Sequence, residues 1–238
     1  MAKEIIFLLI IFLSNIVQAI TGFAGTAVAM PFSLLIVGYH TAIPVLNLVA
    51  LAICIPLVAF HFKEILWKEV LWMLLFIGIG FLGGYFLKKL PIDQRVFNKV
   101  YGLLVVATAT YLFFFPNEKT KIPFPVLAAV LVLGGVVHQL FVSGGPLGVI
   151  YAAHRIREKH AFRASLSLVW IVLNTILFGE HIILGYFDAR IWILLAIGVA
   201  LSAVSFLIGH FFVKKLSHET FLNLAYGLLF FSGILLLA

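Results

Sequence analysis

The stretch Gln18-Ala-Ile-Thr-Gly-Phe-Ala-Gly-Thr-Ala-Val-Ala-Met-Pro31 interrupts a long apolar run, residues 4–37, with small and turn-forming residues. A second run, residues 124–153, is interrupted at the matching place by His138-Gln-Leu-Phe-Val-Ser-Gly-Gly-Pro146. Glycine costs backbone entropy in a helix and proline lacks an amide donor, so each stretch predicts a helix broken inside a membrane. A matched pair of broken helices is a typical sequence sign of a transporter's binding site.

The composition of the whole chain supports a membrane setting. Hydrophobic residues make up 64% of the 238 residues and charged residues 11%, whereas a soluble domain is about 45–50% apolar. The mean hydropathy is +1.20. Further apolar runs, near the ~20 residues needed to cross a bilayer, lie at 41–60, 69–87, 97–115, 161–179, 190–213 and 220–238. With the two broken segments, these runs predict an all-α integral membrane protein with about eight transmembrane elements.

An internal repeat organises these elements. Gly25 and Gly145 lie about half a chain apart, and so do two Lys-Lys-Leu strings, at 88–90 and 214–216. Two Asn-x-x-Tyr-Gly-Leu-Leu strings follow in the same order. We therefore predict two homologous four-element repeats, each beginning with a Gly-interrupted broken helix. The first transmembrane repeat covers 1–116, the linker 117–123, and the second transmembrane repeat 124–238.

The basic loops suggest an orientation, because positive charge is retained on the cytoplasmic side. The most basic loops are 88–99 and 155–163. If each broken segment crosses the membrane once in total, both loops lie inside, and 61–69, 117–123 and 180–190 lie outside. An even number of crossings in each half then favours parallel repeats. If a broken segment crosses twice instead, the repeats are inverted.

Neither interruption contains Asp, Glu, Lys or Arg. A broken helix exposes backbone N–H groups and a partial positive charge at the start of its second half, which favours an anion. We expect the backbone at 22–26 and 143–146 to hold a small oxyanion between the repeats. The candidate substrate-binding residues are Gln18, Thr21, Gly22, Gly25 and Thr26 in the first segment, and His138, Gln139, Ser143, Gly144, Gly145 and Pro146 in the second. Gln18, Thr21, His138 and Gln139 are the expected side-chain donors.

His138 is the titratable group deepest in an interrupted segment. It could donate to an anion or carry a coupled proton, since the unperturbed pKa of histidine is about 6.5. Alternatively, it is a neutral histidine hydrogen-bonded to a neighbouring helix. Asn47 and Asn174 could line the same cavity or form interhelical hydrogen bonds. The basic cluster at 155–163 is explained by topology alone.

The two interruptions resemble the TauE/SafE family of sulfite and organosulfonate permeases, in residues 18–31 and in Phe141-Val-Ser-Gly-Gly-Pro-Leu-Gly-Val-Ile-Tyr151. The resemblance covers essentially the whole chain. It implies a multi-pass permease of the bacterial cytoplasmic membrane that moves sulfite, thiosulfate or a small sulfonate, here by alternating access at a midplane site. The family pattern has runs of glycine in the first motif, whereas Ala24 and Thr26 flank Gly25 here, which leaves the anion open.

Two other function classes compete with an anion permease. A membrane enzyme acting on a lipid phosphate would need an intramembrane carboxylate or arginine, and the interruptions contain none. A channel or a cation carrier would show acidic residues facing its pore. A carrier of a non-sulfur solute also remains an alternative. We therefore expect a permease rather than an enzyme, with a small anion and the lipid bilayer as partners, and without a metal, a cofactor or a nucleic acid.

Overall fold

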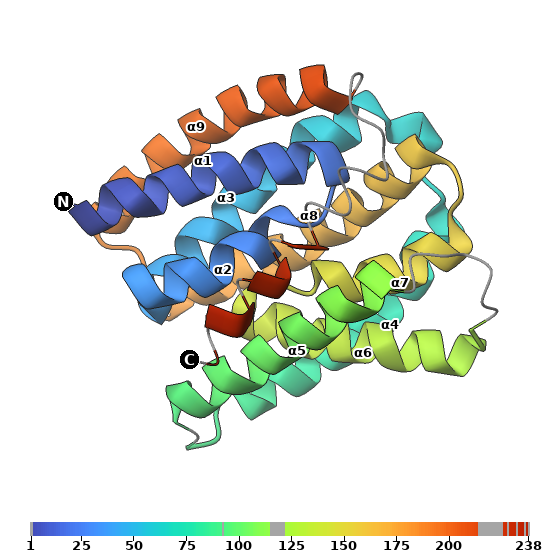
Figure 1. Cartoon of the computed structure of the whole chain (residues 1–238), viewed down its shortest axis with the longest axis horizontal. Coiled ribbons are helices and arrows are strands. Elements are labelled where there is room, and N and C mark those ends of the chain that lie inside the picture. Colours follow the sequence, from blue (N-terminus) through green and yellow to red (C-terminus); the bar gives the residue numbers. More distant parts are fainter. Residues whose placement is uncertain are drawn as a thin grey trace.

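The computed structural model describes residues 2–91, 93–114 and 122–213, together with 226, 227, 229–231, 233–235 and 237. Figure 1 shows the helices of this chain. Their bounds are α1 (Ala2–Thr21), α2 (Gly25–Ile36), α3 (Tyr39–Phe60), the short 3-10 helix η1 (Phe62–Glu64), α4 (Trp67–Leu87), α5 (Gln94–Phe114), α6 (Phe124–Phe141), α7 (Gly145–Arg155), α8 (Lys159–Ile183) and α9 (Ala189–Val213).

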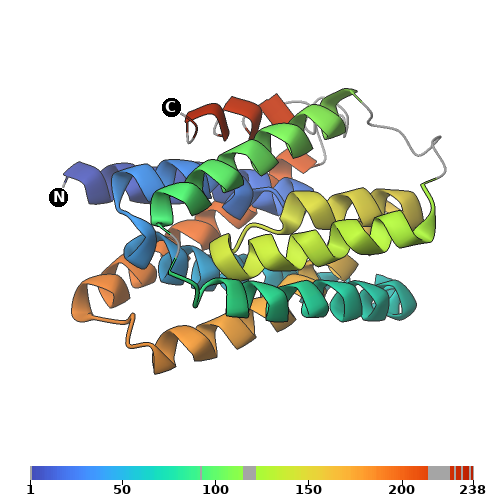
Figure 2. The same cartoon turned by 90° about the horizontal axis from the view of Figure 1, so that it is seen from below.

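Seven helices in the described part of the chain are long and apolar enough to cross a membrane: α1, α3, α4, α5, α6, α8 and α9. The chain is therefore an all-helical multi-pass protein. The eighth expected element, 220–238, lies largely outside the described residues, as do most of the expected linker at 117–123 and the second Lys-Lys-Leu string. Figure 2 shows the described helical residues near the C-terminus beside α5, and Gly233 packs against Gly102 and Val106.

Both expected breaks are present. Gly22, with φ +84°, ends α1, and Val142, with φ +53°, ends α6. The first is the left-handed conformation that glycine adopts freely. The second is costly for a β-branched residue and could not be read from the glycines of the motif. Pro31 does not break a helix, contrary to expectation, because α2 continues through it to Ile36. Pro146 lies in the first turn of α7, where a missing N–H costs nothing.

Each broken segment forms a hairpin. The start of α2 lies back against Ser14 and Gln18 of α1, and Gly148 of α7 lies against Gly134 of α6. At 12 and 11 residues, α2 and α7 are each too short to span the ~30 Å hydrocarbon core alone. The chain therefore starts and leaves each broken segment on the same side.

This return makes the preferred parallel arrangement wrong. The rings of His61, after α3, and His160, at the start of α8, stack at 4.5 Å. Lys88, after α4, pairs with Glu180, near the end of α8, at 2.9 Å. Hence α3 and α8, which correspond in the expected repeats, run in opposite directions. The basic loops 88–99 and 155–163 consequently lie at opposite ends of the molecule, and their charge no longer assigns an orientation. We call the end that contains the loop 88–99 the Glu180 end. We call the opposite end, which contains the loop 155–163 and the start of α4, the Glu69 end.

The contacts between the two halves are reciprocal. In Figure 1, α9 lies along α1, and α4 lies along α6. Asn15 Nδ2 donates to Ser202 Oγ at 3.1 Å in the first contact. In the second, Gly80 packs on the backbone of Val132, and Gly135 on that of Ile77. The first long helix of each half therefore packs against the third long helix of the other half. An inverted duplication predicts this arrangement. The duplication itself stays a prediction from the sequence.

Candidate functional site

The first turn, between α1 and α2, is closed by its own side chains. Gln18 Oε1 accepts the N–H of Gly25 at 2.7 Å and so caps α2. Thr21 Oγ1 accepts the N–H groups of Phe23 and Ala24, at 3.3 and 3.2 Å. These bonds satisfy buried amides that a helix start leaves without partners. They also occupy the hydroxyl of Thr21, which was expected to donate to an anion and donates instead to the carbonyl of Val17.

The second turn, between α6 and α7, is held from α5. Ser143 Oγ accepts the hydroxyl of Tyr101 at 2.6 Å, and the Tyr101 ring stacks on Phe141 at 4.2 Å. The N–H of Val142 donates to the carbonyl of His138 at 2.8 Å. Gly144 packs so closely on the carbonyl of Gly134 that a side chain would not fit. Ser143, Gly144 and Pro146 therefore shape the turn.

The two turns meet in the interior. A Cβ atom added to Gly145 would lie 2.5 Å from the carbonyl oxygen of Phe23, so only glycine allows this approach. The first turns of α2 and α7 thus converge from opposite halves of the sequence, and both present the positive ends of their helix dipoles. A small cavity lies at this point, lined by Gln18, Phe23, Thr26, Ala50, His138, Val142, Gly145, Trp170 and Asn174. We call it the central cavity.

The lining of the central cavity is polar, and the described residues that form it include no Asp, Glu, Lys or Arg. His138 Nε2 is 3.0 Å from Asn174 Oδ1, and the His138 ring stacks on Trp170 at 5.0 Å. His138 Nδ1 and Trp170 Nε1 are both buried, and neither has a hydrogen-bond partner among the described residues. Buried polar atoms are normally paired, so these atoms beside a cavity can form hydrogen bonds with a molecule bound in it.

Four of the expected residues, Gln18, Thr26, His138 and Gly145, line the central cavity. Trp170 was not expected, because a tryptophan in an apolar helix usually indicates packing. Asn174 lines the cavity and also bonds between helices, since Asn47 Nδ2 donates to its carbonyl at 3.1 Å. Gln139 does not reach the cavity. Its Nε2 donates to Glu180 Oε2 at 2.6 Å, so this residue belongs to another cluster.

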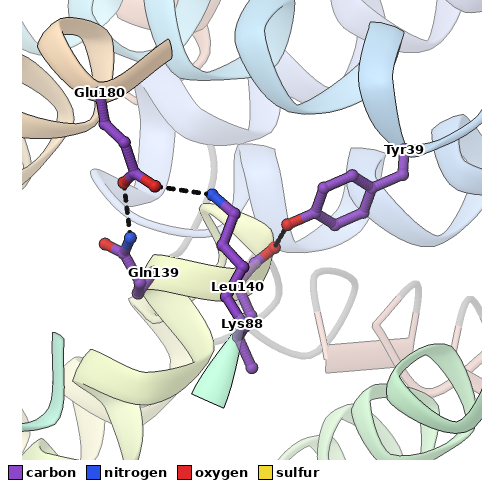
Figure 3. A network of polar contacts seen from close by, with 5 residues as sticks. All are labelled: Tyr39, Lys88, Gln139, Leu140 and Glu180. Atoms are coloured by element: carbon purple, nitrogen blue, oxygen red, sulfur yellow. Dashed lines mark hydrogen bonds and ion pairs between the residues drawn. The ribbon is translucent and has the colours of Figure 1, made fainter. Parts of the chain in front are cut away.

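Figure 3 shows that cluster at the Glu180 end. Glu180 joins Lys88 and Gln139, and Tyr39 donates to the carbonyl of Leu140 at 2.8 Å. A large cavity of about 810 Å³ adjoins it, and its lining includes Tyr39, Lys88, Leu140 and Glu180. Burial and then the nearby Glu180 carboxylate raise the pKa of Tyr186, another lining residue. We call it the entrance cavity.

A thin wall separates the two cavities. Phe81 lines the entrance cavity, and its ring lies 6.3 Å from that of His138, which lines the central cavity. Likewise, Leu140 lines the entrance cavity, and Val142, two residues later, lines the central cavity. The end of α6 and the second turn therefore lie between the two cavities.

The Glu69 end is held by different contacts. Tyr151 of α7 donates to Glu69 Oε2 at 2.6 Å, and Arg155 Nε lies 3.3 Å from the same oxygen. The α6–α7 hairpin is thus tied to the rest of the protein at its turn, through Gln139, and at its tail, through Tyr151 and Arg155.

Among the described residues, His61, Glu64 and His160 form a group whose ligand types and separations could hold a metal ion. The two rings are stacked on each other, and Glu64, exposed at the end of η1, already lies 3.2 Å from His61 Nδ1 through its Oε1. This group lies at the Glu69 end, away from the residues that line the central cavity. Glu158 lies next to this group. Burial alone would raise the pKa of Glu158, but hydrogen bonds from the backbone N–H groups of Ala161 and His160 outweigh burial, and the net effect is a lowered pKa.

Comparison with known proteins gives one match. Residues 7–236 match the family described as sulfite exporter TauE/SafE, which covers both turns and nearly the whole chain. No curated protein and no solved structure matches the chain.

Proposed function

The chain belongs to the TauE/SafE sulfite exporter family of membrane transporters, and from this premise we propose that it carries a small sulfur-containing oxyanion through the central cavity. The substrates in view are sulfite, thiosulfate and small organosulfonates, and the membrane is the bacterial cytoplasmic membrane. A transporter family supports a permease rather than an enzyme.

The observation that carries the proposal is the lining of the central cavity. The described residues of this lining supply two helix N-termini, the hydroxyl of Thr26 and the N–H of Trp170, which has no hydrogen-bond partner among them, and none of them is charged. A cation would find no carboxylate there. An oxyanion has several acceptor oxygens, which neutral donors and helix dipoles can satisfy.

The size of the cavity bears on the mechanism. Its volume is about 10 Å³, room for about one water molecule. An oxyanion therefore requires the two turns to move apart, which supports alternating access. We propose that the anion enters from the entrance cavity when the contacts of Glu180 and Tyr39 release the second turn. It leaves when the contacts of Glu69 with Tyr151 and Arg155 open at the other end.

Tryptophan fluorescence of the full chain in detergent tests the site. Sulfite or thiosulfate bound beside Trp170 is expected to change the emission, and Trp170→Phe should abolish the change. Trp192→Phe, which alters an exposed tryptophan stacked on Phe187, should preserve it.

A second variant tests the hydroxyl of Thr26 as a hydrogen-bond donor, while Trp170 remains as the fluorescent reporter. Thr26→Val replaces the hydroxyl by a methyl group of nearly the same size and should weaken oxyanion binding by about tenfold. The proposal fails if Trp170→Phe responds to the oxyanions as the unaltered chain does, or if Thr26→Val binds them with unchanged affinity.

A further inference from the structure

Arg163, near the start of α8, is a buried cation that has no anionic partner within the described part of the chain. Only 4% of its surface is exposed. Its Nη2 donates to the carbonyl of Ala19, and its Nε has no hydrogen-bond partner among the described residues. It takes part in none of the ion pairs that these residues form. One helical turn earlier, Lys159 adds a second positive charge.

Three other cations among the described residues are paired with carboxylates. Lys88 pairs with Glu180, Arg155 with Glu69, and Arg190 with Glu4. Each of the three is more exposed than Arg163. A guanidinium stays charged in proteins, and burying it without a counter-ion is strongly unfavourable. A single backbone carbonyl offsets only part of that cost, so the position calls for an anion, and no carboxylate of the described residues supplies one.

The place of Arg163 connects it with the site. A Cβ atom added to Gly22 would lie 3.3 Å from the Cα, Cβ and Cγ atoms of Arg163, so the first turn packs directly on this side chain. The next residue, Phe23, lines the central cavity and packs edge-on against Phe162. Arg163 therefore stands behind the cavity wall formed by the first turn, on the side of the Glu69 end.

We propose that Arg163 binds the transported oxyanion when the first turn moves, at a second site between the central cavity and the Glu69 end. This inference rests on the proposed function and adds a fixed positive charge to a pathway whose centre has only neutral donors. The guanidinium presents parallel N–H groups that match two oxygens of a sulfur oxyanion, whereas a lysine offers a single point charge.

The test combines uptake with thermal stability in the full chain. Arg163→Gln removes the charge and keeps an amide donor, Arg163→Lys keeps the charge, and Arg157→Gln removes an equal charge from an exposed position at the same end. In proteoliposomes, Arg163→Gln should lower the maximal rate divided by KM for sulfite or thiosulfate by about 10- to 100-fold. Arg163→Lys should recover part of this loss, and Arg157→Gln should transport normally.

Melting temperatures measured without any oxyanion separate this role from a structural one. Arg163→Gln should melt no lower than the unaltered chain, because it loses a buried charge that lacked a counter-ion. A lower melting temperature would overturn the inference, since Arg163 would then serve chiefly to hold the end of α1. Normal uptake by Arg163→Gln would also overturn it, while leaving the proposed function intact. Absence of uptake by the unaltered chain would overturn both.

Discussion

The carbonyl of Phe23 and the Cα of Gly145 approach each other so closely that a methyl group on Gly145 would lie 2.5 Å from the oxygen. These residues lie half a chain apart, one in each interrupted segment. Their contact is where the two hairpins join, and the central cavity is built around it. A site assembled this way exists only while both turns keep their positions.

Gly145→Ala is therefore expected to reduce uptake and to lower the free energy of unfolding by about 1–3 kcal/mol, the usual cost of overpacking. Gly78→Ala provides the control, because nothing lies within 4 Å of the added methyl group in α4. It should be neutral or stabilising by up to about 1 kcal/mol. Equal melting temperatures and equal uptake for the two variants would show that the contact does not matter.

The inverted arrangement predicts which loops share a side of the membrane. Single cysteines at the exposed positions Arg95 and Asp188, near the Glu180 end, should react with an impermeant maleimide from the same side of sealed vesicles. A cysteine at Arg157 should react from the opposite side. The native Cys54 is fully buried and gives little background. Reaction of Arg95→Cys and Arg157→Cys from one side would restore the parallel arrangement.

Release of the second turn should depend on Glu180. Glu180→Gln removes the ion pair with Lys88 and the negative charge on the side chain that accepts the hydrogen bond from Gln139 of α6. Partly exposed pairs contribute up to about 1 kcal/mol, so opening should become about fivefold more frequent. A cysteine at Leu140 should then be modified about fivefold faster. Glu64→Gln, at the other end, should leave this rate unchanged, and an unchanged rate in Glu180→Gln would argue against this gate.

His138 offers a test of proton coupling. Its Nδ1 has no hydrogen-bond partner in the part of the chain that the structure describes, so a proton bound there would turn an acceptor into a charged donor beside the cavity. Uptake by the unaltered chain should increase when the outside is made more acidic than the inside. His138→Gln should transport without this response, and His210→Gln, at an exposed position, should retain it. A full response in His138→Gln would exclude His138 as the proton carrier.

The sequence was sufficient to predict the broken helices and four of the residues that line the central cavity, because glycine and proline act locally on the backbone. The sequence did not predict that the repeats are inverted. The argument from charge assumed that each broken segment crosses the membrane once, whereas in the structure α2 and α7 return to the side where α1 and α6 begin. Arg163 was attributed to topology and Trp170 was not singled out. Neither role has a local signal, because a missing partner is visible only when every neighbour is known.

The most direct test of the central claim is uptake of radiolabelled sulfite, thiosulfate, sulfate and a small sulfonate into proteoliposomes. The unaltered chain should show saturable uptake of at least one sulfur oxyanion. The double variant Thr26→Val with Trp170→Phe should retain its fold and lose most of that uptake. Uptake of none of these anions by folded protein, or undiminished uptake by the double variant, would contradict the account.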